Sequence, residues 1–124
     1  MTRKEQERLD QLGWDNLQII QNPSWFCFSL DAILLAAFAQ ISPQDKVMDL
    51  GTGTGVIPLL LSYREKNARI QGLELQPEVL SMAQRSIALN HKEAQITLYQ
   101  GDLCTASALF GKGQYDLVVS NPPY

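Results

Sequence analysis

Short apolar runs alternate with amphipathic stretches along most of this chain, and each kind of run predicts one kind of element. Val47–Leu50 is too short for a helix and predicts a strand, whereas a helical pattern follows it over residues 56–61. A second helix is expected to begin at Pro77, and further strand patterns recur at residues 69–74, 95–99 and 115–120. Strands that alternate with helices pair in parallel through right-handed crossovers, so we expect an α/β fold with a doubly wound parallel sheet.

The first part of the chain follows a different pattern. Thr2–Leu12 is charged and has few apolar anchors, so we expect a frayed helix or a disordered lead-in. Leu17–Gln21 predicts a short strand that closes at the turn Asn22-Pro23-Ser24. Trp25–Phe28 is the expected hairpin partner of that strand.

An apolar helix is expected next, because Ser29 is a suitable N-cap for the apolar run over residues 32–39. This helix completes an N-terminal extension of residues 1–43, and residues 44–124 form the α/β unit. The unit has about four predicted strands, and the last would leave the apolar edge Leu117–Val119 bare. We therefore expect this sequence to be the N-terminal half of a longer domain, with a partner that covers the edge as the alternative.

Three glycines spaced two apart follow the first strand of the α/β unit. Gly51, Gly53 and Gly55 allow positive φ angles and let a ligand approach the backbone. Val56 stands where a dinucleotide-binding fingerprint has its third small residue. Asp49 precedes the loop, where its charge disfavours phosphates and favours an ammonium group. The loop therefore predicts a nucleoside-like cofactor that carries a positive charge.

Polar residues also follow the other predicted strands, at the edge where open α/β sheets bind ligands. Glu74 is placed to accept hydrogen bonds from ribose hydroxyls, or is a solvated carboxylate. Asp102 is a candidate acceptor for an adenine amino group, or forms an Asx-turn after Gly101. Asn121-Pro122-Pro123-Tyr124 either offers rigid acceptors to one planar amino group or is simply a proline-rich turn.

Together these residues resemble the motifs of class I S-adenosylmethionine-dependent methyltransferases that modify exocyclic or amide nitrogens. The stretch Gln21–Ala36 is similar, more narrowly, to the bacterial tRNA1(Val) adenine-N6 methyltransferases. The resemblance implies a Rossmann-like fold and S-adenosylmethionine as the cofactor. It also implies a nucleic-acid substrate, a tRNA. The implied cofactor site comprises Asp49, Gly51, Thr52, Gly53, Gly55, Glu74, Leu75, Asp102, Leu103 and Asn121.

The resemblance also implies a catalytic set, Asn121, Pro122 and Tyr124. The N6 lone pair of adenine is delocalised into the ring. Hydrogen-bond acceptors on Asn121 and Pro122 would hold the N–H groups so that this lone pair points at the cofactor's methyl group. They would also stabilise the positive charge that develops on nitrogen. Most of the acceleration would come from alignment. Tyr124 would stack on a base taken out of its helix.

Three alternatives stay open at this point. The Asn-Pro-Pro-Tyr element also occurs in enzymes that methylate a glutamine side chain of translation release factors, although these carry a separate helical domain before the glycine strand. Methylation of a guanine amino group in ribosomal RNA is a further alternative, in which Phe is common at the position of Tyr124. A non-catalytic fragment that only binds S-adenosylmethionine belongs to a different functional class.

The net charge of -3 gives the chain no global basic field that would recruit a nucleic acid. Arg64, Lys66 and Arg69 are candidates for a local basic patch, but the sequence does not distinguish them from ordinary solvated charges.

Few residues are available for metal binding or disulfide formation. Cys27 and Cys104 are expected to be free buried thiols in a reducing compartment, and with His91 they are too few for a structural zinc site.

Met1–Asp10 is too charged for a signal peptide, and the apolar run over 32–39 is too short to cross a bilayer. We therefore expect a cytoplasmic protein without a metal or a membrane anchor.

Overall fold

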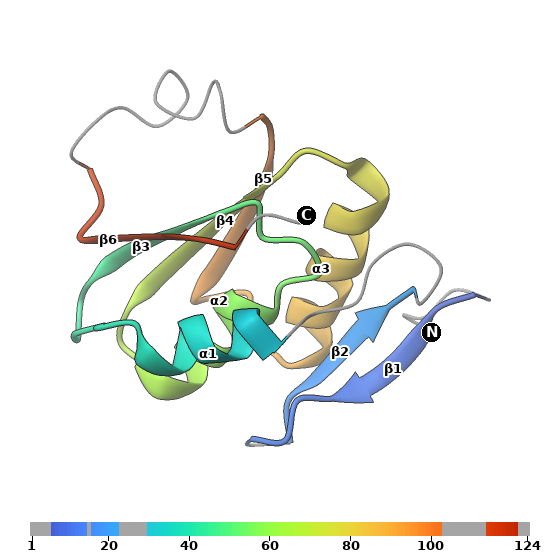
Figure 1. Cartoon of the computed structure of the whole chain (residues 1–124), viewed down its shortest axis with the longest axis horizontal. Coiled ribbons are helices and arrows are strands. Elements are labelled where there is room, and N and C mark those ends of the chain that lie inside the picture. The colour runs from blue at the N-terminus through green and yellow to red at the C-terminus, as the bar shows by residue number, and fades with distance from the viewer. Residues whose placement is uncertain (1–5, 15, 23–29, 103–113, 122–124) are drawn as a thin grey trace.

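The computed structural model describes residues 6–14, 16–22, 30–102 and 114–121. It contains a two-stranded and a four-stranded sheet, with helices packed between and beside them (Figure 1). In chain order the elements are β1 Arg8–Gln11, β2 Gln18–Gln21, α1 Leu30–Phe38, β3 Lys46–Leu50, α2 Val56–Arg64, β4 Arg69–Glu74, α3 Pro77–Leu89, β5 Ile96–Gln100 and β6 Leu117–Ser120.

The four-stranded sheet has the order β5-β4-β3-β6, and all of its neighbours pair in parallel. The chain moves outward from β3 through β4 to β5 and then crosses back to place β6 on the other side of β3. This reversal confirms the predicted doubly wound parallel sheet, and it creates a topological switch point between β3 and β6. The predicted strand at 69–74 matches β4, while β5 begins one residue later than expected and β6 two residues later.

The helices that the structure describes, α1, α2 and α3, lie on one face of this sheet. Val47 of β3 lies opposite Ile70 of β4, which pairs in turn with Ile96 of β5, and all three are buried in one apolar cluster with residues of α1 and α2. Each such side chain contributes about 1.5–3 kcal/mol when fully buried. Every residue of α2 from Val56 to Ser62 is buried. The glycine loop that precedes α2 is therefore anchored at both ends in the core.

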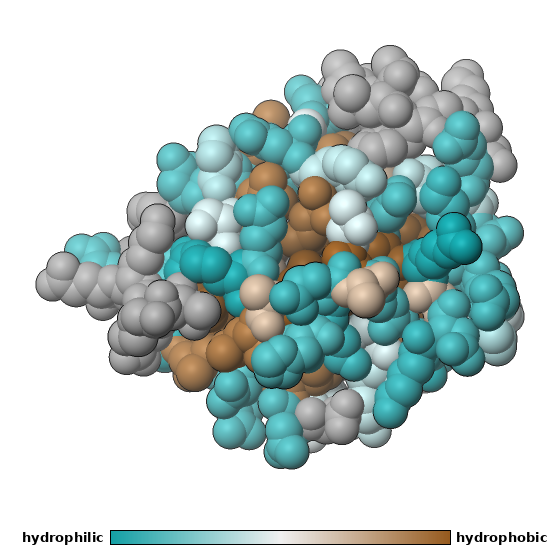
Figure 2. Space-filling model, turned by 180° about the vertical axis from the view of Figure 1, so that it is seen from behind, coloured by the Kyte–Doolittle hydropathy of each residue, from teal (hydrophilic) through white to brown (hydrophobic). Residues whose placement is uncertain are grey.

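The second face of the sheet carries the alternate residues of each strand. On this face Met48 and Leu73 are buried, whereas Val118 is 54% exposed and Tyr99 is 37% exposed. Viewed from behind, the molecule shows apolar surface at its centre between polar side chains (Figure 2). Val118 belongs to the strand for which an apolar edge was expected.

The N-terminal segment forms a hairpin that differs from the predicted one. β1 pairs with β2 in antiparallel fashion, with Leu9 opposite Ile20. The expectation of a frayed helix or disordered lead-in is therefore wrong for Arg8–Gln11. The pairing depends on a turn held by a hydrogen bond from the amide of Leu12 to the carbonyl of Leu17, 2.9 Å long, which local composition does not reveal. Trp25–Phe28, the expected partner, lies outside the described residues.

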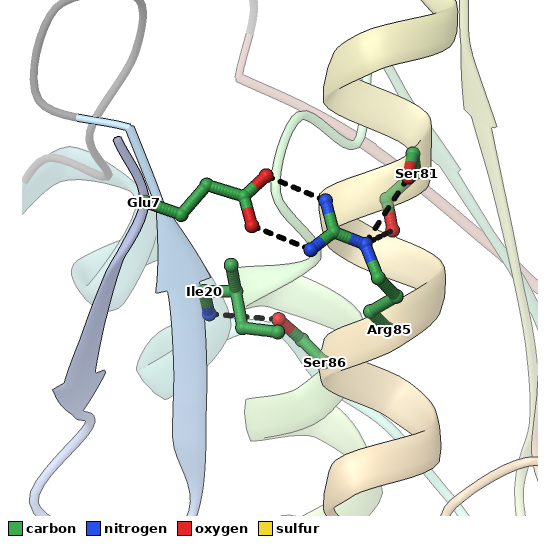
Figure 3. A network of polar contacts seen from close by, with 5 residues as sticks. All are labelled: Glu7, Ile20, Ser81, Arg85 and Ser86. Carbon is green, nitrogen blue, oxygen red and sulfur yellow. Dashed lines mark hydrogen bonds and ion pairs between the residues drawn. The ribbon is translucent and has the colours of Figure 1, made fainter. Parts of the chain in front are cut away.

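A polar seam fixes this hairpin to α3 (Figure 3). Both terminal nitrogens of Arg85 donate to the carboxylate of Glu7, with Nη2 2.6 Å from Oε2. The amide of Ile20 donates to Ser86 Oγ at 2.8 Å, and the amide of Gln18 donates to Asn90 Oδ1 at 2.9 Å. The side chain of Glu7 is only 6% exposed, so this ion pair is largely removed from water.

Candidate functional site

The carboxyl ends of β3, β4, β5 and β6 meet at one edge of the sheet because the strands are parallel. Leu50 at the end of β3 lies opposite Ser120 of β6 and Leu73 of β4, and Glu74 lies opposite Gln100. The loops that leave these strands are therefore neighbours in space. The switch point between β3 and β6 lies on this edge, which is where open α/β sheets bind their ligands.

The glycine loop leaves β3 in a conformation that requires glycine. Gly51, Gly53 and Gly55 have φ angles of 72, 58 and 93°, which confirms the predicted positive values. The amides of Gly51 and Thr52 both donate to the carbonyl of Leu73, at 2.8 and 2.9 Å. The loop is thus fastened to β4 before α2 begins.

Asp49 lies beneath this loop and is fully buried. Its Oδ2 accepts a hydrogen bond from Thr52 Oγ1 at 2.6 Å, whereas its Oδ1 has no partner among the described residues. Burial raises the pKa of Asp49 to about 7, the hydrogen bond from Thr52 opposes that rise, and the charge of Glu74 adds to it. A cation placed at Oδ1 would satisfy the unpaired acceptor and favour the ionised carboxylate.

Gly72 makes room for this arrangement, and the sequence analysis missed it. It lies directly opposite Asp49 in the β3–β4 register. A Cβ at Gly72 would stand 3.0 Å from the Cβ and Oγ1 of Thr52 and 2.7 Å from Leu98 Cδ2. Glycine inside a strand often marks such a close approach, and that signal was present in the pattern of β4.

Glu74 is half-buried at the end of β4 and holds the loop from the other side. Its Oε1 accepts from the amide of Gly53 at 2.8 Å, and its Oε2 accepts from the amide of Gln76 at 3.1 Å. Each oxygen keeps a second acceptor position, since an ionised carboxylate has about four. Leu75 follows with 56% of its surface exposed, so it offers an apolar surface beside the carboxylate.

Two further candidates lie on the same edge. Asp102 is exposed two residues beyond β5, and Asn121 is half-buried directly after β6. Ser120 Oγ donates to the carbonyl of Leu50 at 3.2 Å, which ties the start of the Asn121 loop to β3. Leu103, Pro122 and Tyr124 lie outside the described residues. The structure thus joins Thr52 to Asp49 and Gly53 to Glu74 by hydrogen bonds.

Within the described ranges, no group of three or more His, Cys, Asp and Glu side chains is placed to hold a metal ion. Among the helices that the structure describes, none is both long and apolar enough to cross a membrane. Cys27 and Cys104 lie outside the described residues.

Comparison with known proteins places the chain in a family. The model of the methyltransferase small domain matches residues 16–124. The chain belongs to this family. A tRNA1(Val) (adenine(37)-N6)-methyltransferase of Porphyromonas gingivalis is 37% identical over 100 residues, which cover 76% of this chain and 39% of the relative. The chain thus spans about 39% of the length of the curated relatives it matches.

Solved structures show the same fold. A protein of Pyrococcus horikoshii described as a transferase matches with a TM-score of 0.73 at 18% identity, over 93% of this chain and 42% of that chain. An RNA methyltransferase of Salinibacter ruber, crystallised with S-adenosyl-L-homocysteine, matches with a TM-score of 0.64 at 21% identity, over 77% of this chain and 59% of that chain. The fold of this methyltransferase small domain is that of the S-adenosylmethionine-dependent methyltransferases.

Proposed function

We propose that this methyltransferase small domain binds S-adenosylmethionine at the carboxyl edge of its sheet. We propose further that the whole protein transfers the methyl group to an exocyclic amino group, adenine N6 of a tRNA. The family supports transfer of a methyl group, and the names of the relatives at 35–39% identity support the tRNA adenine. A tRNA substrate also favours a cytoplasmic location.

The geometry of the edge supports distinct roles for the described candidates Asp49, Gly51–Gly55, Glu74 and Leu75, and the resemblance suggests roles for the others. Oδ1 of Asp49 would accept from the cofactor's ammonium group, and the open backbone at Gly51–Gly55 would lie against its methionyl part. Glu74 would accept from the ribose hydroxyls with the acceptor positions that Gly53 and Gln76 leave open. Leu75 and Leu103 would flank the adenine, and Asp102 would accept from its amino group.

The residues after β6 would prepare the nucleophile. The bound cofactor supplies a methyl group on a sulfonium centre. The side-chain oxygen of Asn121 and the carbonyl oxygen of Pro122 would accept hydrogen bonds from the two N–H groups of the target amino group. This arrangement would turn the lone pair of the nitrogen toward the methyl group. The two oxygens would also stabilise the positive charge that develops on nitrogen. Tyr124 would stack on the unpaired base, and no separate general base is needed because the methylated nitrogen is acidic.

One observation carries the proposal. Asp49 is fully buried beneath the glycine loop and keeps one carboxylate oxygen without a partner among the described residues. A buried acceptor that lacks a donor is costly unless a ligand completes it. An ammonium group beside a nucleoside matches both this oxygen and the neighbouring Glu74.

Calorimetry with S-adenosylmethionine tests the cofactor site, and a transfer assay on unmodified tRNA then tests the reaction in the whole protein. We expect binding by this chain and transfer to tRNA. Transfer to a release-factor peptide or to ribosomal RNA would assign the protein to one of the two alternative substrates. Binding without any transfer by the whole protein would support a module that only binds the cofactor, and absence of binding would overturn the proposed site.

The substitution Asn121→Ala in the whole protein tests the proposed clamp on the amino group. We expect transfer to be abolished while affinity for S-adenosylmethionine stays within about threefold, because the clamp acts on the substrate. Gln114→Ala is the matched control, since Gln114 is exposed and precedes β6. Turnover that survives in Asn121→Ala would show that the clamp is assigned to the wrong residue.

A further inference from the structure

A hollow opens at the amino edge of the sheet, opposite the proposed cofactor site. It lies between the loop from α2 to β4 and the loop from α3 to β5, and its volume is about 450 Å³. Its lining includes the charged or titratable side chains Lys66, Arg69, His91 and Lys92, together with the amides Asn67 and Gln95. Among the described residues, no acidic side chain belongs to the lining, although Glu65 lies beside it and its Oε1 accepts a hydrogen bond from the amide of Asn67 at 3.2 Å.

The cations of this hollow differ from the other cations that the structure describes. Outside the hollow, each Lys or Arg of the described ranges has a partner. Arg8 pairs with Asp10, Arg85 with Glu7, Lys46 stands 4.9 Å above the ring of Tyr115, and Arg64 donates to the carbonyls of Ala36 and Ala39.

The three remaining cations of the described ranges are Lys66, Arg69 and Lys92, and all three line this one hollow. Within the described part of the chain, none of their side chains makes an ion pair or a hydrogen bond. In a chain whose net charge is -3, three unpaired cations thus gather at a single place. A local cluster of cations of this kind is typical of surfaces that bind anions.

The backbone around the hollow is well supported. Gln95 Nε2 donates to the carbonyl of Glu65 at 2.7 Å and so links the two loops. The amides of Gln95 and Ile96 both donate to the carbonyl of Lys92, at 3.0 and 2.9 Å, and the amide of Arg69 donates to the carbonyl of Asp45 at 2.8 Å. The carboxyl ends of α2 and α3 also lie at this edge, and their partial negative charge reduces the mutual repulsion of the cations.

We propose that this basic hollow, formed by Lys66, Arg69 and Lys92, binds the phosphodiester backbone of the RNA substrate away from the methylated base. The proposal rests on the proposed function, because it requires an RNA partner. Three charges without base-reading geometry suit sequence-independent contacts with phosphates, and Asn67 and Gln95 add polar groups to the same surface. The six residues of β4 separate the two edges by about 20 Å, so these contacts would engage a different stretch of the RNA from the target base.

The test compares the 124-residue chain with the triple variant Lys66→Gln, Arg69→Gln, Lys92→Gln in binding an unmodified tRNA transcript over a range of salt concentrations. We expect the variant to bind at least about tenfold more weakly at 0.1 M salt. Its slope of log affinity against log salt should be smaller by about 2, since each lost phosphate contact removes roughly 0.7–0.9. Calorimetry with S-adenosylmethionine should give the same affinity for both chains.

Single substitutions provide a matched control. Lys66→Gln and Arg8→Gln change the net charge equally, but Arg8 lies on β1, far along the chain from the hollow, and pairs with Asp10. Only the Lys66 variant should lower the salt slope. Equal slopes for the triple variant and the unsubstituted chain, with cofactor binding intact, would overturn the hollow as an RNA contact and leave the proposed function standing. Failure of the unsubstituted chain to bind S-adenosylmethionine would instead overturn the proposed function.

Free phosphate is the other source of the same ligand chemistry. Backbone amide resonances of residues 66–69 and 91–95 can be followed while inorganic phosphate or the tRNA transcript is added at constant ionic strength. We expect the transcript to shift them and phosphate to leave them in place. Shifts with phosphate but not with the transcript would assign the hollow to a free anion and overturn the RNA contact.

Discussion

The two edges of the sheet carry opposite arrangements of polar groups. At the carboxyl edge, Asp49 and Glu74 are held by backbone amides and a hydroxyl, and one buried carboxylate oxygen has no partner in the described part of the chain. At the amino edge, Lys66, Arg69 and Lys92 surround an open hollow. The net charge of -3 is the sum over the whole chain, so it does not reveal that the two edges differ in the sign of their charged groups. A small cationic ligand suits the first edge, and a polyanion suits the second.

The substitution Asp49→Asn should have the largest effect on this comparison. It removes the negative charge from the carboxyl edge but keeps the shape, so affinity for S-adenosylmethionine should fall by at least about 100-fold, as for other buried charge pairs. Calorimetry measures the loss. Asp45→Asn makes the same chemical change at the amino edge and should leave cofactor affinity within about twofold. Equal losses in the two variants would remove the distinction between the edges.

The same carboxylate should make stability depend on pH. Burial raises the pKa of Asp49 from its ordinary value of 3.8 to about 7 in the folded chain, so the folded state binds more protons between these pH values. The free energy of unfolding should therefore fall as pH rises from about 4 to about 7, by something on the order of 4 kcal/mol. Asp49→Asn should flatten this dependence and be the more stable chain at pH 8. Urea unfolding of both chains at several pH values checks this, and parallel curves would contradict it.

A smaller effect is expected from Gly72→Ala, which crowds the carboxyl edge without changing charge. The added Cβ meets Thr52 and Leu98, so we expect a loss of about 1–3 kcal/mol in the free energy of unfolding and weaker cofactor binding. Gly13→Ala is the control: its φ angle of +91° is strained for alanine, but nothing lies within 4 Å of the new Cβ. That variant should lose about 1 kcal/mol and keep its cofactor affinity. Unchanged cofactor affinity in Gly72→Ala would show that the position of Thr52 does not depend on the space left by the missing Cβ of Gly72.

The smallest effect is expected from Thr52→Val, which keeps the volume but removes the hydrogen bond to Asp49. That bond opposes the rise in the pKa of Asp49, so its loss should raise the pKa further. The pH below which cofactor binding weakens should therefore move upward. Affinity at pH 7 should fall about fivefold, which corresponds to about 1 kcal/mol for one lost hydrogen bond. Thr52→Ser should restore the pH profile. A Val variant with the original profile would show that Thr52 only fills space.

Much of the α/β unit could be predicted from the sequence, because its signals are local. An apolar run followed by glycines and an amphipathic stretch defines a strand, a tight turn and a helix within about twenty residues. The candidate positions Asp49, Glu74, Asp102 and Asn121 were expected at one edge, and parallel pairing places them there. The roles of these residues remain proposals.

The N-terminal hairpin could not be predicted correctly, because its pairing is decided by contacts far along the chain. Arg8–Gln11 has a charged composition that resembles a solvated lead-in, yet it pairs with β2. The hairpin is also held to α3 through Arg85 and Glu7, which are 78 residues apart in sequence. Local composition does not encode such a partner.

By itself the sequence determined the glycine loop and its acid, since positive φ angles and short-range periodicity depend only on neighbouring residues. The tertiary structure alone decided that Gly72 makes room for Thr52 above Asp49, and that Lys66, Arg69 and Lys92 surround one hollow. The physical reason is that strand register and loop packing bring together residues that lie 20 or more positions apart. Burial then determines which of their polar groups have partners and which are left for a ligand.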